Sequence, residues 1–141
     1  MTMDLGAADV LVPLEPATLV RLMVNLCANA NDAMPDGGRL TIRSSVTRMD
    51  VGRRPSELSS EQLPDGRYAE VVVADTGVGI DRGLISKIFE PYFTTKTPGR
   101  GTGLGLATVY GAMAQCGGAI HVDSAPGQGA RFTLWLPLEG Q

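Results

Sequence analysis

Two asparagines one helical turn apart are the first residues whose types and spacing suggest chemistry. Asn25 and Asn29 lie four positions apart in a segment with helical periodicity, so their side chains share one face of the predicted helix. Asparagine is a poor helix former, and amide oxygens that project into a cleft could hold a hard cation, which prefers oxygen ligands. A solvated polar stripe on the helix surface is the alternative interpretation.

A carboxylate at the end of an apolar strand forms the second candidate. Asp75 follows the strand-like segment Tyr68–Ala74 and is itself followed by the sequence TGVGI. At the end of a strand, this carboxylate would lie on the floor of a cleft. Gly77 and Gly79 would let the backbone turn tightly and let a flat ligand come close. An ordinary β-turn has the same DxGxG pattern, so this segment alone leaves both readings open.

Two further segments precede a second predicted helix. Residues 88–96 read IFEPYFTTK and contain three of the seven aromatic residues of the chain, which would anchor a loop to the body of the protein. Positions 81–100 carry four basic and two acidic residues, and this local positive charge suits a lid over phosphates. Residues 101–106 read GTGLGL and lead into the helix, whose N-terminus would attract an anion. This pattern is not the P-loop, because GxxxxGK[ST] occurs nowhere in the chain.

The elements that would position these groups alternate between strands and helices. Periodicity and breaker residues predict an edge strand over Asp9–Leu14, a helix over Glu15–Met34, a strand over Arg39–Val46, a long surface loop over Met49–Arg67, a strand over Tyr68–Ala74, a helical turn near Leu84–Phe89, a helix over Leu104–Gln115, and a hairpin of Ala119–Asp123 with Ala130–Leu136. This order predicts an α/β domain with one mixed sheet and helices on one face.

The composition narrows the class of protein. A chain of 141 residues with 43% apolar residues has room for one domain with a hydrophobic core. Its 12 basic and 15 acidic residues argue against binding to nucleic acid or to an anionic membrane surface. With no long apolar run and no signal peptide, we expect a soluble, cytoplasmic protein without direct membrane contact. Cys27, Cys116 and the single histidine, His121, offer neither a zinc site nor a disulfide framework, and we expect a structural role for His121.

In this order, the four segments resemble the catalytic, ATP-binding domain of two-component sensor histidine kinases. That domain belongs to a superfamily shared with DNA gyrase, the MutL repair proteins and the ninety-kilodalton heat-shock chaperones. The similar motifs are the N box in NLCANANDAMPDGG, the first glycine box in DTGVGI, the F box in FEPYFTTK and the second glycine box in GTGLGLATVYG. The resemblance extends from about Val10 to Leu138, and the F box disfavours the related anti-sigma-type serine kinases.

The resemblance implies a two-layer α/β sandwich of the Bergerat type, with a mostly antiparallel sheet. The domain would span residues 9–138 between flexible ends at 1–8 and 139–141. ATP would lie between the helices under a lid over about 81–100.

The resemblance also implies roles for individual residues. Asn29 would bind Mg²⁺ with Asn25 beside it, and Asp75 would accept a hydrogen bond from the adenine amino group. Gly77 and Gly79 would shape the adenine pocket. The other residues expected to contact or enclose the nucleotide are Ile80, Phe89, Phe93, Lys96, Arg100, Gly101, Thr102, Gly103, Leu104 and Gly105. Of these, Phe89 and Phe93 would anchor the lid, Lys96 and Arg100 would contact phosphate, and Lys96 would act with Asn29 in catalysis.

Two positions depart from the family pattern. Asp32 stands where many members carry a basic residue that contacts the terminal phosphate, and Ala130 stands where a hydroxyl often lies near adenine. The phosphoacceptor histidine of the family lies on a separate dimerisation hairpin, for which there is no room before Asp9. We therefore expect a monomeric domain that donates the γ-phosphate to such a hairpin, from which a response regulator receiver domain would take it. A nucleotide-binding regulatory module without kinase activity is the alternative.

Overall fold

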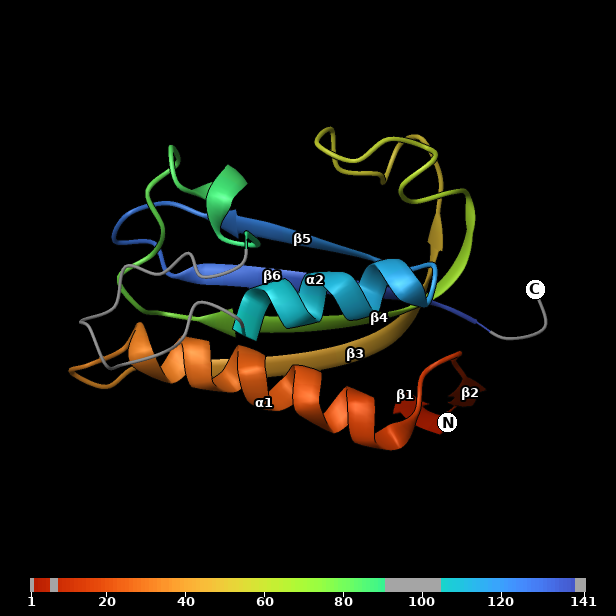
Figure 1. The fold of residues 1–141 in the computed structure, drawn as a ribbon, viewed down its shortest axis with the longest axis horizontal. Helices are drawn as coiled ribbons and strands as arrows, with labels where there is room; N and C mark the ends of the chain where they lie inside the picture. The colour runs from red at the N-terminus through yellow and green to blue at the C-terminus, as the bar shows by residue number, and fades with distance from the viewer. Residues whose placement is uncertain (1, 6–7, 91–104, 139–141) are drawn as a thin grey trace.

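The structure, a computed structural model, describes residues 2–5, 8–90 and 105–138. Two helices cover one face of a four-stranded sheet (Figure 1). The elements are β1 (Thr2–Leu5), β2 (Ala8–Leu11), α1 (Pro16–Asp32), β3 (Leu40–Met49), β4 (Gly66–Asp75), the 3₁₀ turn η1 (Ile85–Lys87), α2 (Gly105–Gln115), β5 (Ala119–Ser124) and β6 (Ala130–Pro137). The strand order is β3-β4-β6-β5. The predicted two-layer sandwich is confirmed. Each pair of neighbouring strands in this sheet is antiparallel, so the described sheet has no parallel pair.

The main core lies between the sheet and the two helices. Residues of α1 at three- and four-residue spacing, Leu22, Leu26 and Ala30, are buried, and α2 contributes Val109 and Met113. Alternate residues of the strands point toward them, because successive side chains of a strand face opposite sides of the sheet. The strand residues of this core are Ala69, Val71, Val73, Ile120, Val122, Ala130, Phe132, Leu134 and Leu136.

The N-terminal segment differs from the prediction. Residues 2–5 and 8–11 pair as a separate antiparallel hairpin, β1–β2, where the sequence predicted a flexible end and one edge strand over Asp9–Leu14. β2 ends at Leu11, and the Leu14 N–H then donates to the Val12 carbonyl at 2.8 Å across Pro13. Proline has no N–H to continue a strand ladder, which explains why the strand ends early.

Among the described helices, none has the length and apolar character needed to cross a membrane.

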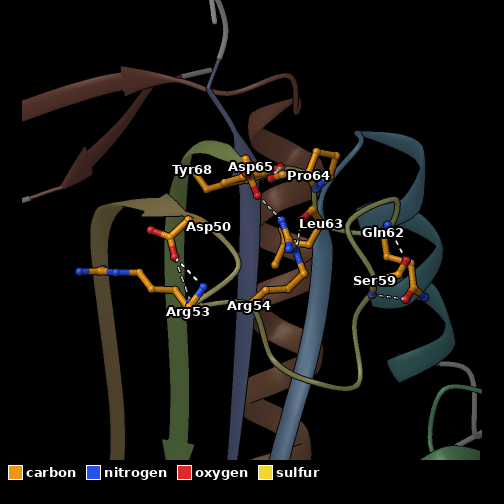
Figure 2. Close-up of polar contacts among 10 residues, drawn as sticks. Asp50, Arg53, Arg54, Ser59, Gln62, Leu63, Pro64, Asp65 and Tyr68 are labelled. Atoms are coloured by element: carbon orange, nitrogen blue, oxygen red, sulfur yellow. Dashed lines mark hydrogen bonds and ion pairs between the residues drawn. The ribbon is translucent and has the colours of Figure 1, made fainter.

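The loop between β3 and β4 is held together by side chains that bond to its own backbone (Figure 2). The Arg54 Nε–H donates to the Leu63 carbonyl at 2.7 Å, and another guanidinium nitrogen contacts the Asp65 carboxylate. The Tyr68 hydroxyl donates to the Pro64 carbonyl at 2.7 Å, and burial raises the pKa of Tyr68. These bonds fix a segment for which the sequence predicted only a long surface loop.

Beneath this loop lies a second, smaller core on the face of the sheet opposite the helices. The side chain of Leu63 is fully buried there. It belongs to a cluster with Met49, Tyr68, Ala119 and Trp135. Met49, Tyr68 and Trp135 alternate with the residues that face the helices, so the loop covers the outer face at this end of the sheet.

His121 also lies on this outer face. It stands in β5 opposite Thr133, and its Nε2 atom is 3.1 Å from Glu57 Oε2 in the loop. Its ring is also 6.5 Å from the Trp135 ring, between centroids. These contacts tie the loop to the sheet, which agrees with the structural role expected for His121.

Leu63→Ala should lower the free energy of unfolding by about 2 to 5 kcal/mol, the usual cost of truncating a fully buried leucine. Val51, in the same loop, is 84% exposed. Val51→Ala should therefore change stability by less than about 0.5 kcal/mol. Urea unfolding of both variants would measure the difference. If both substitutions changed the free energy of unfolding by equally small amounts, Leu63 would add nothing to the stability of the core.

Candidate functional site

Three residues of neighbouring strands form a row at one end of the sheet. Asp75 ends β4 and pairs with Ala130 of β6, and Ala130 pairs with Ser124, which ends β5. All three share the helix-facing side, since their positions alternate with outward-facing residues. Asp75 is only 8% exposed. Asp75 is therefore a nearly buried residue at the end of the sheet, on its helix-facing side. That it forms the floor of a ligand cleft stays a prediction.

The two oxygens of the Asp75 carboxylate have different surroundings. Oδ1 accepts hydrogen bonds from the Gly77 N–H at 2.8 Å and from the Ala130 N–H at 3.3 Å. Within the described part of the chain, no donor bonds to Oδ2. Among the described residues, the fully buried side-chain polar atom without a partner is Trp135 Nε1, so Oδ2 of Asp75 keeps some accessible surface. Oδ2 can therefore accept a hydrogen bond from a ligand, which fits the predicted contact with the adenine amino group.

The two glycines after Asp75 allow close contacts within the protein. A Cβ atom on Gly77 would lie 2.3 Å from the Ala33 carbonyl oxygen, at the end of α1. The next residue, Val78, donates its N–H to the same oxygen at 2.9 Å. Gly79 has φ +78° and leaves no room for a Cβ, which would lie 2.0 Å from the Ala125 oxygen. The structure shows close approach of two other backbone segments at these glycines, and the predicted close approach of a ligand stays a prediction.

Three positions along α1 connect its C-terminal half to the rest of the site. Asn25 lies beside the start of α2, where its Oδ1 would be 3.7 Å from a Cβ on Gly105. Ala33, eight positions later, contacts the loop after Asp75. Asn29 lies midway between them and on the same side of the helix. Its half-buried side chain is thus between the N-terminus of α2 and the Asp75 loop.

The first part of the predicted lid packs against the core. Ile88 is 6% exposed, and Ile80, Ile85 and Phe89 pack on the main cluster. The Phe89 ring stacks on Tyr110 of α2, with centroids 5.5 Å apart and planes inclined by 29°. Phe89 therefore packs against the body of the protein, and its role as an anchor of the lid stays a prediction. The other predicted residues, Phe93, Lys96, Arg100, Gly101, Thr102, Gly103 and Leu104, lie outside the described residues.

A cavity of about 390 Å³ lies at the same end of the sheet. Its walls combine the row with residues of the two loops that follow β4 and β5. The lining residues are Ala74, Asp75, Arg82, Asp123, Ser124, Ala125, Gln128, Ala130 and Arg131. Ala74, Asp123 and Arg131 belong to the outward-facing set, so this cavity borders the row from the side away from the helices.

Sequence reasoning missed two hydroxyl groups that tie this end of the sheet together. The Thr76 Oγ1 accepts the Arg39 N–H at 2.9 Å, which joins the start of β3 to the Asp75 loop. The Ser124 Oγ accepts the Ile80 N–H at 2.8 Å and donates to the Gly129 carbonyl at 2.6 Å. The only sequence signal was the position of Ser124 before the turn APGQG, where serine commonly bonds to turn backbone.

Comparison with known proteins gives a consistent result. Residues 15–140 match the family described as histidine kinase-, DNA gyrase B-, and HSP90-like ATPase. The sensor kinase CckA of Brucella abortus is 47% identical over 117 residues, which are 83% of this chain and 12% of CckA. The structure of the mycobacterial sensor histidine kinase MprB is 29% identical with a TM-score of 0.65, over 89% of this chain and 73% of that one. Full-length ShkA in complex with AMPPNP is 28% identical with a TM-score of 0.64, over 90% of this chain and 23% of that one.

Proposed function

The chain belongs to the histidine kinase-, DNA gyrase B-, and HSP90-like ATPase family, and we propose that it binds Mg-ATP and donates the γ-phosphate to a histidine on a separate dimerisation hairpin. The relatives it resembles are sensor histidine kinases, of which it spans only the ATPase part. The observation that carries the proposal is the Asp75 carboxylate, which is buried, bonded through Oδ1 and left with an acceptor at Oδ2.

This carboxylate can distinguish adenine from guanine. The exocyclic amino group of adenine is a donor that Oδ2 can accept, whereas guanine has a carbonyl oxygen at the same ring position. Two acceptors facing each other in a buried pocket would leave both unpaired. The AMPPNP bound to ShkA is an analogue of ATP, which supports an adenine nucleotide as the ligand.

The phosphate end of the nucleotide would lie toward the start of α2. The first N–H groups of a helix have no partner within the helix and favour an anion. Asn25 lies beside this helix start, and Asn29 lies one turn further along α1. Their neutral amide oxygens fit a Mg²⁺ ion that is also bound to phosphate, since this ion takes few protein ligands.

Catalysis in this proposal consists of binding and orientation. The acceptor histidine nitrogen would bond to the γ-phosphorus as the bond to the β–γ bridging oxygen breaks, and ADP would leave. The residues of this chain would hold the triphosphate in line for that displacement. A magnesium ion bound to the phosphates would neutralise the charge that develops during transfer. A receiver domain of a response regulator would then take the phosphoryl group from the hairpin.

The 141-residue chain alone should bind ATP and ADP in a magnesium-dependent way without phosphorylating itself. Its only histidine, His121, lies on the outer face of the sheet beside Glu57, away from the row that includes Asp75. Calorimetry would measure binding, and incubation with γ-labelled ATP would test for phosphorylation. Acid-labile label on the lone chain would contradict this prediction.

A nucleotide-binding regulatory module without kinase activity is the second candidate, and Asp32 favours it. Asp32 is an exposed carboxylate at the end of α1, three positions after Asn29. There its negative charge would repel the terminal phosphate of the nucleotide. Incubating the chain and ATP with a separately prepared dimerisation hairpin separates the two candidates. Acid-labile label on the hairpin supports the kinase, and nucleotide binding with no label supports the module.

A further inference from the structure

The Ser124 hydroxyl joins two loops that are far apart in the sequence. It accepts the Ile80 N–H at 2.8 Å, across 44 positions, and donates to the Gly129 carbonyl at 2.6 Å. One loop follows the Asp75 strand and the other connects β5 to β6. A single side chain therefore bonds to both of the loops that enclose the end of β4.

The bond to Gly129 acts on the peptide unit that contacts Asp75. The carbonyl of Gly129 and the N–H of Ala130 belong to one planar peptide group. Its oxygen accepts from Ser124, and its N–H donates to Asp75 Oδ1 at 3.3 Å. Rotation of this peptide would break both bonds together. A hydrogen bond to the carbonyl also polarises the N–H, which strengthens the bond on the other side.

Close packing makes this arrangement sensitive to small shifts. A Cβ atom on Gly129 would lie 2.1 Å from the Asp75 carbonyl oxygen, so the turn backbone lies directly against Asp75. The Gly127 N–H donates to the Val78 carbonyl at 2.7 Å, which adds a second link between the same loops. The turn after β5 and the loop after β4 therefore form one unit around the carboxylate.

We propose that Ser124 is a positioning residue that orients the Asp75 carboxylate for the adenine amino group and so sets the preference for adenine nucleotides. The inference rests on the proposed function, because it assumes that Oδ2 of Asp75 contacts this amino group. Ser124 acts through the Gly129–Ala130 peptide: with Oδ1 held by Ala130 and Gly77, Oδ2 keeps a fixed direction toward the ligand. Ala130 has no hydroxyl that could bond to adenine, so recognition of the base depends on the orientation of the Asp75 carboxylate.

The test compares two ligands that differ only in the group that Asp75 would bind. ADP carries the 6-amino group, and purine riboside 5′-diphosphate lacks it. Ser124→Ala should lower the affinity for ADP about 3- to 10-fold, which corresponds to the loss of about one hydrogen bond. It should lower the affinity for the analogue less than about twofold. Ser124→Thr keeps the hydroxyl and should restore ADP binding to within about twofold of the original protein. Ser45→Ala, an exposed serine of β3, is the matched control and should change neither affinity.

The outcomes separate the two proposals. Equal weakening of both ligands by Ser124→Ala, or no weakening of either, would overturn the positioning role. If the protein without substitutions bound ADP and the analogue with equal affinity, the proposed contact between Asp75 and adenine would be wrong, and this inference with it. If Ser124→Ala does not fold, Ser124→Cys keeps a side chain of the same connectivity, slightly larger, and weakens both bonds because a thiol is a weak donor and acceptor. The same ADP-selective loss in that variant supports the proposal, and its absence contradicts it.

Discussion

Replacing Asp75 with asparagine is expected to weaken ATP and ADP about 5- to 150-fold while the protein stays folded. The amide oxygen of the new side chain can still accept the N–H groups of Gly77 and Ala130, so the backbone around it is preserved. The amide NH₂ group then replaces Oδ2 and presents donors to the adenine amino group, which is also a donor. Such a mismatch in a buried pocket costs about 1 to 3 kcal/mol.

Calorimetry with ADP and GDP, together with a thermal melting curve, would test this expectation. The ratio of ADP to GDP affinity should fall, because the new NH₂ group can donate to the guanine oxygen. Asp123→Asn is the matched control, since Asp123 is an exposed acid in β5 on the outer face at the same end of the sheet. Unchanged ADP affinity in a folded Asp75→Asn protein would rule out the proposed adenine contact.

Asn29→Ala is expected to abolish the magnesium dependence of ATP binding and phosphoryl transfer to an added hairpin. Asn29 lies on α1 between Asn25, which is beside the start of α2, and Ala33, which contacts the Asp75 loop. Removal of its amide would take away a proposed oxygen ligand without opening the core, because the buried face of α1 is formed by other residues. Stability should stay the same or rise by a few tenths of a kcal/mol, since alanine is the better helix former.

A magnesium titration and a melting curve on the same sample would measure both effects. Asn31→Ala is the matched control, because Asn31 is an exposed asparagine of the same helix. It should leave the magnesium dependence unchanged. If the Asn29→Ala protein were unfolded, Asn29 would be needed for the stability of the helix, and its proposed role as a magnesium ligand would be contradicted.

Local patterns in the sequence were sufficient to predict most elements of the fold. The apolar spacing of Leu22 and Leu26 predicted α1, because it matches the period of a helix. The β-branched, mostly apolar composition of Tyr68–Ala74 predicted β4. The family resemblance drawn from four motifs is confirmed by the match over residues 15–140. The burial of Asp75 beside two glycines was likewise predicted from its position after an apolar strand.

The features that were missed depend on contacts between distant segments. The loop around Leu63 has no periodic pattern, so nothing in the sequence indicated that it covers a second core. The role of Ser124 follows from strand register, which places it beside Ala130 and Asp75, and from a bond to Ile80 that crosses 44 positions. Strand register and hydrogen bonds between distant residues form only in the assembled sheet, so neither composition nor residue spacing predicts them.

The contact between Val78 and Ala33 has a consequence for the order of folding. The carbonyl of Ala33, at the C-terminal end of α1, accepts the Val78 N–H at 2.9 Å, so this helix end is capped by a residue 45 positions later. Local bonds can complete the earlier turns of α1 soon after collapse, whereas the last turn gains this partner only after β3 and β4 have paired. Because closing so long a loop is slow compared with helix growth, we expect the end of α1, which borders the Asp75 loop, to become fixed late in folding.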